Sequence, residues 1–402
     1  MNCAPRREAT GTRPGGTRGR GRTADLSPAW ALLALIARAV PLSIAGLLPV
    51  VPAVAAEERV MVGGLLDAEF WATDDGSRLL SRNEGEPAHA GRLRLWAAVE
   101  ILPGLQGFTL GEVEGGPATG EEETEVELEQ AFLRYTLNIR SHLRIEAGRV
   151  VAPLGNFSRR YFSNVNPLIG SPDSYSVSYP FGIQVIGRAA AFDYSVSILD
   201  RPLVNENYVP ELESSALRPA VTLGLTPVVG LRLGVYGTRG PYLGEAITPF
   251  LPAGPAWDDY EQSIGGFDLQ FSRGHFELNG DLARSSYDAP GLTRSLRGTA
   301  WFVEPKFTFS PRWFGALRYE VNDYPYIQPI SPGVWIATAA KLSDIEAGVG
   351  YRITPDAILK LAYRADRWDV AASQKAFFPD GYSIAAQLSW TFDLLSWFDR
   401  PK

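Results

Sequence analysis

The sequence predicts an all-β fold, a closed transmembrane antiparallel β-barrel of about sixteen strands. Two observations lead to this prediction. Apolar and polar residues alternate with a period of two along most of the chain after residue 60, which is typical of strands whose two faces meet different surroundings. Short turns and long polar connections also alternate along the chain, and membrane barrels sort their connections between two rims in this way.

The composition excludes several other classes. The 402 residues include 10 Trp, 16 Tyr and 19 Phe, too many aromatic side chains for a disordered chain. The single cysteine, Cys3, excludes a disulfide framework. Only one stretch, near the N-terminus, approaches the roughly 18 apolar residues that a transmembrane helix needs, so a polytopic helical protein is excluded.

Residues 1–55 are predicted to be a cleaved signal peptide. Residues 1–28 are rich in arginine, an apolar stretch runs from Ala29 to Ala56, and small residues close it at positions 53–56. A transmembrane anchor is the alternative, although Arg38 and Pro41 interrupt the apolar stretch. The mature chain, residues 56–402, is then a single barrel domain with a net charge of −12, which argues against nucleic-acid binding.

The strands are expected in order from residue 60 to residue 398. Alternation is clearest in 92–101, 192–198, 231–236, 267–271, 276–282, 301–309, 313–320, 345–352, 359–366 and 382–392. It weakens in 105–114, 124–136 and 181–190, which leaves fourteen or eighteen strands open. The last strand ends at Phe392 or at Phe398, with a short tail in either case.

The connections fix the strand count. Tight turns are expected at 103–104, 138–142, 226–230, 272–274, 310–312 and 354–357. Eight long polar connections are expected at 73–90, 115–123, 150–180, 201–216, 239–260, 285–297, 322–337 and 368–381. Eight hairpins give sixteen strands, with both barrel ends at the short-turn rim. Because only helices or closed barrels satisfy every backbone group in lipid, the apolar faces are expected to meet lipid and the charged faces to line water.

The predicted lumen faces carry charges of both signs. The basic candidates are Arg92, Arg94, Arg144, Arg218, Arg232, Lys306, Arg318, Arg352, Lys360 and Arg364. The acidic candidates are Asp67, Glu69, Glu100, Glu127, Glu129, Glu146, Asp193, Asp268, Glu277, Asp281, Glu304, Glu320, Glu346 and Asp366. These ten bases and fourteen acids predict a nearly balanced, slightly acidic lumen, and many of them are expected to pair as networks that stabilise the wall.

No motif for catalysis or metal binding stands out. His89, His142 and His275 fall in separate connections, and the chain has no Walker A, G-x-S-x-G or H-E-x-x-H pattern. The acidic run at 121–129 is interpreted as a solvated loop tip rather than a cation site. We therefore expect no catalytic residue, no metal and no cofactor.

The segment Leu143 to Gly155, a strand followed by a Pro-x-Gly turn, together with Glu129 to Tyr135 before it, resembles outer-membrane porins of the phosphate-selective porin-like group. The resemblance implies a Gram-negative outer-membrane porin, a water-filled channel for passive diffusion of small hydrophilic solutes or ions. It also implies that loop 150–180 folds into the lumen, with Arg159, Arg160 and Asp173 as constriction charges. The alternative is an external loop whose arginines bind lipopolysaccharide phosphates.

The expected partners follow from this interpretation. They are outer-membrane lipid and lipopolysaccharide, the barrel-assembly machinery, and small solutes or ions, with no nucleic acid and with a homotrimer left open. Two rival functions remain at this point. One is a barrel with a blocked lumen that acts as an enzyme or an assembly or adhesion protein, and the other is a soluble periplasmic β-protein.

Overall fold

The computed structural model describes residues 60–77, 80–116, 124–172, 178–200 and 216–394. The predicted signal peptide, 1–55, lies outside these residues and stays a prediction. So does the end of the chain around Phe398, while Phe392 lies within the last described strand. Among the described residues, no helix is long and apolar enough to cross a bilayer, a result that does not bear on spans made of strands.

Sixteen strands follow one another along the described chain. They are β1 (Val60–Thr73), β2 (Ala88–Leu102), β3 (Leu105–Gly115), β4 (Glu125–Asn138), β5 (Leu143–Arg149), β6 (Phe181–Ala189), β7 (Phe192–Leu199), β8 (Arg218–Val228), β9 (Leu231–Pro241), β10 (Glu261–Arg273), β11 (Phe276–Tyr287), β12 (Leu296–Thr308), β13 (Trp313–Ser331), β14 (Val334–Arg352), β15 (Ala357–Val370) and β16 (Gly381–Asp393). Short 3-10 helices lie in the connections: η1 (Asn83–Gly85), η3 (Phe157–Arg159), η5 (Glu245–Phe250), η6 (Trp257–Asp259) and η7 (Ala372–Phe377).

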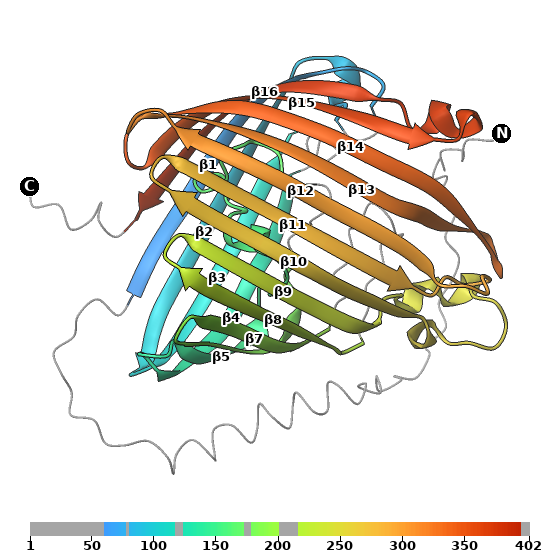
Figure 1. Cartoon of the computed structure of the whole chain (residues 1–402), viewed down its shortest axis with the longest axis horizontal. Helices are drawn as coiled ribbons and strands as arrows, with labels where there is room; N and C mark the ends of the chain where they lie inside the picture. Colours follow the sequence, from blue (N-terminus) through green and yellow to red (C-terminus); the bar gives the residue numbers. More distant parts are fainter. Residues whose placement is uncertain (1–59, 78–79, 117–123, 173–177, 201–215, 395–402) are drawn as a thin grey trace, which may run out of the picture. The chain divides into compact units, whose positions relative to one another are not determined.

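The strands form a closed antiparallel barrel, which confirms the predicted fold and strand number. Each strand pairs with its neighbours in sequence, and β1 pairs with β16 from Gly63 opposite Asp393 to Thr73 opposite Ser383. Figure 1 shows the strands inclined and side by side around the barrel. Closure leaves no sheet edge with unpaired backbone groups, which is the condition for a sheet surrounded by lipid.

Seven tight turns of two to four residues gather at one rim. The first is Pro103-Gly104, where Gly104 has a φ of 81°, a conformation that glycine adopts without strain. The turn at 190–191 was not predicted, because it follows a segment of weak alternation. Since β1 begins and β16 ends opposite each other, both barrel ends lie at this rim, as expected.

One predicted long connection is wrong. Residues 322–337 belong to β13 and β14, which continue as a hairpin to the turn Pro332-Gly333, where Gly333 has a φ of 73°. Three prolines and several polar residues made this stretch resemble a loop. It is held as a strand pair because Ile327 and Trp335 are buried against the β9–β10 connection, and Trp335 Nε1 donates a hydrogen bond to the Phe250 carbonyl at 2.9 Å.

The segments of weak alternation form ordinary strands, and a register shift lies between two of them, β3 and β4. The β3–β4 register shifts between Leu110 and Gly111, opposite Leu128 and Gln130. Such a bulge changes the phase of the side chains, so the adjacent Glu129 and Gln130 are both buried. A strict period of two therefore fails in β4, although the strand itself is continuous.

Candidate functional site: the barrel interior

The first half of loop 150–180 packs against the inner wall. Asn156 is fully buried, and its Nδ2 donates to the carbonyls of Leu269 on β10 at 3.1 Å and Gly280 on β11 at 3.4 Å. Phe157 is buried beside Phe302 of β12, with ring centroids 6.2 Å apart. These contacts place η3 inside the barrel.

The next part of the loop contacts β1, β16 and β15, the strands at and beside the place where the barrel closes. Ser163 Oγ donates to Asp67 Oδ1 on β1 at 2.5 Å, and Asn164 donates to Thr391 on β16 at 3.3 Å. Lys360 Nζ on β15 donates to the carbonyls of Asn166 and Leu168, both at 3.0 Å. The described part of loop 150–180 thus crosses the interior from β10 to β1.

A buried charge network anchors the loop. Arg318 Nη2 lies 2.6 Å from Glu304 Oε2, and Arg318 Nη1 lies 3.1 Å from Glu346 Oε2. Arg160 of the loop also pairs with Glu304, and the Gly170 amide donates to Glu346 Oε1 at 2.9 Å. Two arginines therefore balance two glutamates that are excluded from water, the arrangement in which buried charges are tolerated.

Arg94 organises a second network on β1 to β4. Its buried guanidinium pairs with Glu112 and lies 3.4 Å from Glu129. It also packs over the rings of Tyr161 and Phe162, whose centroids are 5.0 and 5.2 Å away. Burial raises the pKa of the Tyr161 hydroxyl, so this loop residue remains a neutral hydrogen-bond partner. The loop is therefore held by cation–π contacts as well as by ion pairs.

The candidate lumen charges differ in their access to water. Nine of the fourteen acids are buried, against four of the ten bases. The buried acids are Asp67, Glu129, Glu146, Asp268, Asp281, Glu304, Glu320, Glu346 and Asp366. The buried bases are Arg94, Arg218, Arg318 and Lys360. Most of the candidate acids therefore lie within the packed wall and loop, out of contact with water.

The remaining candidates lie in smaller pairs. Arg232 joins Asp193 at 2.7 Å and Asp268 at 2.5 Å. Lys306 pairs with Glu277 at 2.8 Å, and Arg364 Nε lies 2.6 Å from Asp344.

Further contacts of the candidates are each made within the wall. Arg92 pairs with Glu114 at 2.8 Å, Gln387 donates to Glu69 at 2.7 Å, and Arg352 packs over the Phe314 ring at 5.5 Å. Glu127 pairs with Arg149, and Glu100 is exposed on β2.

The three constriction candidates have different surroundings. Arg160 is tied to buried Glu304, which does not fit the alternative of an external lipopolysaccharide-binding loop. Arg159 is 59% exposed, with its Nη2 4.0 Å from Asp193 Oδ1. Asp173 lies outside the described residues.

Several residues of the interior were missed. Arg134 on β4 pairs with Glu146 at 2.7 Å. The bulge beside Glu129 changes the phase of the strand, so alternation counted from the residues before the bulge assigns Arg134 to the outer face. Counting back from Arg144 across the next turn would have found it. Tyr161 carries no sequence signal, because its position depends on how the loop crosses the barrel. In the described part of the chain, no group of three His, Cys, Asp or Glu side chains is arranged to hold a metal ion.

Solved structures with a similar fold include OmpF of Salmonella typhi in a complex with daunomycin, OmpT of Vibrio cholerae and an anion-selective porin of Comamonas acidovorans. Their TM-scores are 0.57, 0.55 and 0.55, at 12%, 11% and 11% sequence identity. Each similarity covers 83% of this chain and 97%, 97% and 99% of the respective porin. No family model and no curated protein matches the sequence. The likeness defines the fold, a sixteen-stranded barrel of the porin type.

Proposed function

We propose that the protein is an outer-membrane porin, a non-enzymatic, water-filled channel through which small hydrophilic solutes or ions diffuse passively. One observation carries this proposal. A closed barrel presents apolar side chains outward and charged side chains inward, and a loop packs across its interior. A barrel of sixteen strands is wide enough to leave an aqueous lumen, and the loop would narrow it.

The outer face supports a membrane location. Leu361 is 54% exposed, Val235 51% and Leu282 43%, so a band of large apolar side chains faces outward on different strands. Aromatic pairs flank this band: Trp313 and Tyr351 at the short-turn rim, with centroids 4.7 Å apart, and Tyr363 and Tyr382 nearer the other rim. Exposed apolar surface of this extent is stable in lipid and costly in water.

The export route and partners belong to the same proposal. A signal peptide at 1–55, insertion by the barrel-assembly machinery and contact with lipopolysaccharide would bring the barrel to a Gram-negative outer membrane. Membership of the phosphate-selective group rests on the residues around Leu143 to Gly155 alone and is kept as a narrower proposal. A measurement of whether the channel binds inorganic phosphate more strongly than chloride would test this narrower proposal.

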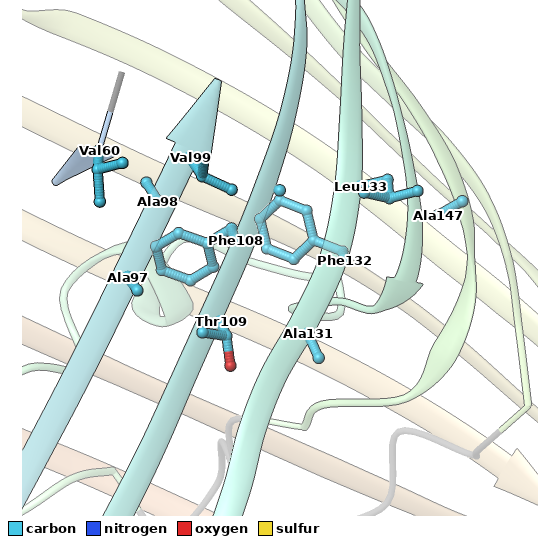
Figure 2. A pocket seen from close by; sticks show the side chains of 11 residues that line it. Val60, Ala97, Ala98, Val99, Phe108, Thr109, Ala131, Phe132, Leu133 and Ala147 are labelled. Atoms are coloured by element: carbon cyan, nitrogen blue, oxygen red, sulfur yellow. The ribbon is translucent and has the colours of Figure 1, made fainter. Parts of the chain in front are cut away.

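A homotrimer is part of the proposal as well. Small residues on β2 to β5, among them Ala97, Gly107, Ala131 and Ala147, leave an apolar depression of about 420 Å³ in the wall (Figure 2). Small side chains on an apolar wall let a neighbouring barrel approach closely. The mass of the detergent-solubilised protein, measured by light scattering, tests this point.

The channel itself is tested by single-channel recording of the refolded mature chain, residues 56–402, in a planar bilayer. Stable current steps are the expected result. The second candidate, a barrel with a blocked lumen, is favoured by the many bonds that hold loop 150–180 across the interior. Correct insertion without current steps would support that candidate and overturn the porin.

A further inference from the structure

We propose that the water-exposed lumen prefers small anionic solutes and that Arg134, Arg144 and Arg159 form the patch that attracts them, here named the arginine patch. The inference rests on the proposed channel function and adds the class of solute. It reverses the charge balance that the sequence count predicts, because it depends on which charges face water rather than on how many are present.

Burial removes acids from the pathway more than it removes bases. Nine of the fourteen candidate acids are buried. Glu304 and Glu346, for example, both form ion pairs with the buried Arg318. Only four of the ten candidate bases are buried. A charge that is paired and excluded from water contributes little field to a solvated pore, so the exposed arginines dominate.

Two arginines of the patch share one acid. Arg134 Nε and Arg144 Nε lie 2.7 and 3.0 Å from the same oxygen, Glu146 Oε1. The other carboxylate oxygen of Glu146 accepts a hydrogen bond from Gln184 Nε2 at 2.5 Å. The side chain of Glu146 is 5% exposed, whereas each arginine side chain is 33% exposed. One buried carboxylate balances one guanidinium, which leaves a positive charge facing water.

The third arginine comes from the loop. Arg159 is the most exposed of the paired cations on the inner side, at 59%, and its nearest acid, Asp193, is already held by Arg232 at 2.7 Å. Arg144 lies opposite Ile186 on β6, and Ile186 lies opposite Ser195 on β7, two residues from Asp193. Arg159 and Arg144 therefore face the same part of the inner wall, and an anion bound there would reduce their mutual repulsion. Planar guanidinium groups bind carboxylate and phosphate oxygens in pairs, so small oxyanions fit this patch.

The exposed acids of the inner face do not cancel the patch. Glu277 pairs with Lys306 at 2.8 Å, and Glu127 pairs with Arg149. Glu100 lies on β2, on a strand that pairs with neither β4 nor β5. The arginine patch therefore remains a local positive excess on β4, β5 and the loop.

The test uses full-length protein purified from membranes and inserted into planar bilayers under a potassium chloride gradient. The expected reversal potential of the wild type corresponds to a chloride permeability above that of potassium. Replacing all three arginines with glutamine should lower the chloride-to-potassium permeability ratio toward or below one. Arg284→Gln is the matched control, because Arg284 is exposed on the β11 face opposite to that of buried Asp281 and Ser285 and should leave the ratio unchanged.

The outcomes separate this inference from the channel proposal. Absence of current steps overturns the channel, whereas steps with a preference for potassium overturn the anion preference alone. An unchanged ratio in the triple variant removes the assignment to the patch. If the triple variant does not insert, Arg159→Gln decides the matter, since an exposed loop side chain 4.0 Å from its nearest acid is dispensable for the wall. Inorganic phosphate added to one side should reduce the chloride current of the wild type more than that of Arg159→Gln.

Discussion

At the scale of single residues, the interior is defined by how charges are shared. Arg318 touches Glu304 and Glu346, and Arg232 touches Asp193 and Asp268, so single arginines hold pairs of acids that would repel each other if left alone. In a medium of low dielectric constant, such a group is stable only while every member is present. The consequence is that conservative changes within these networks are costly, although similar changes on the outer surface are not.

Replacing Glu304 with leucine should destabilise the barrel by about 3–5 kcal/mol, because Arg318 and Arg160 would lose their shared carboxylate inside the protein. The free energy of unfolding in urea, measured for protein folded into lipid vesicles, tests this. Glu261→Gln is the control: its exposed pair with Arg239 should cost no more than about 1 kcal/mol. Equal costs for the two variants would show that the buried network does not stabilise the wall.

Replacing outward-facing Leu361 with arginine should cost about 2–4 kcal/mol if the residue lies near the bilayer midplane. The same change at Val229, fully exposed in the turn between β8 and β9, should cost roughly 0–1 kcal/mol. Vesicle refolding titrations measure both. A Leu361→Arg barrel as stable as the wild type would contradict the proposed lipid-facing side of β15.

At the scale of elements, the strands form a continuous wall and the connections determine what that wall encloses. The β13–β14 hairpin rises beyond its neighbours because Ile327 and Trp335 pack against the β9–β10 connection. Loop 150–180 instead turns inward, where the backbone amides of Ile169 and Gly170 donate hydrogen bonds to Glu346. Each connection goes where its apolar and polar groups are satisfied.

Loosening the inward loop should change the channel more than the fold. The variant Lys360→Met removes the hydrogen bonds to the carbonyls of Asn166 and Leu168 and leaves the Arg318 network intact. We expect single-channel current with larger fluctuations and a higher mean, because the loop would occupy the lumen less firmly. Unaltered current in the inserted variant would show that these bonds do not set the opening.

The connection between β15 and β16 offers a test of pH dependence. Burial raises the pKa of Asp380, but hydrogen bonds from Lys375 and from the Trp368 amide outweigh it, so the pKa lies below the ordinary value. A carboxylate with a lowered pKa stabilises the folded loop at neutral pH, and this contribution is lost as pH falls through the lowered pKa. Amide exchange at Trp368 should therefore accelerate in strong acid, and Asp380→Asn should remove this acid-dependent step.

At the scale of the whole molecule, the barrel and its strand number could be predicted from sequence, but the site could be predicted only in part. Alternation and the sorting of connections are local patterns that survive without knowledge of the fold, and closure follows from the cost of an open edge in lipid. The prediction of a loop at 322–337 was wrong because prolines and polar residues, which are typical of loops, occur here in paired strands. Arg134 was missed because the bulge beside Glu129 changes the phase of β4.

What the sequence by itself determined is the two-faced wall: a period of two assigns each side chain to one face, whatever its partners are. What only the tertiary structure decided is which of the inner charges meet water. That depends on loop 150–180, whose residues bind partners more than a hundred positions away in the sequence, such as Asn164 with Thr391 and Arg160 with Glu304. The sequence counts charges, whereas burial decides which of them act on a solute, because a paired charge without solvent contact is largely neutralised.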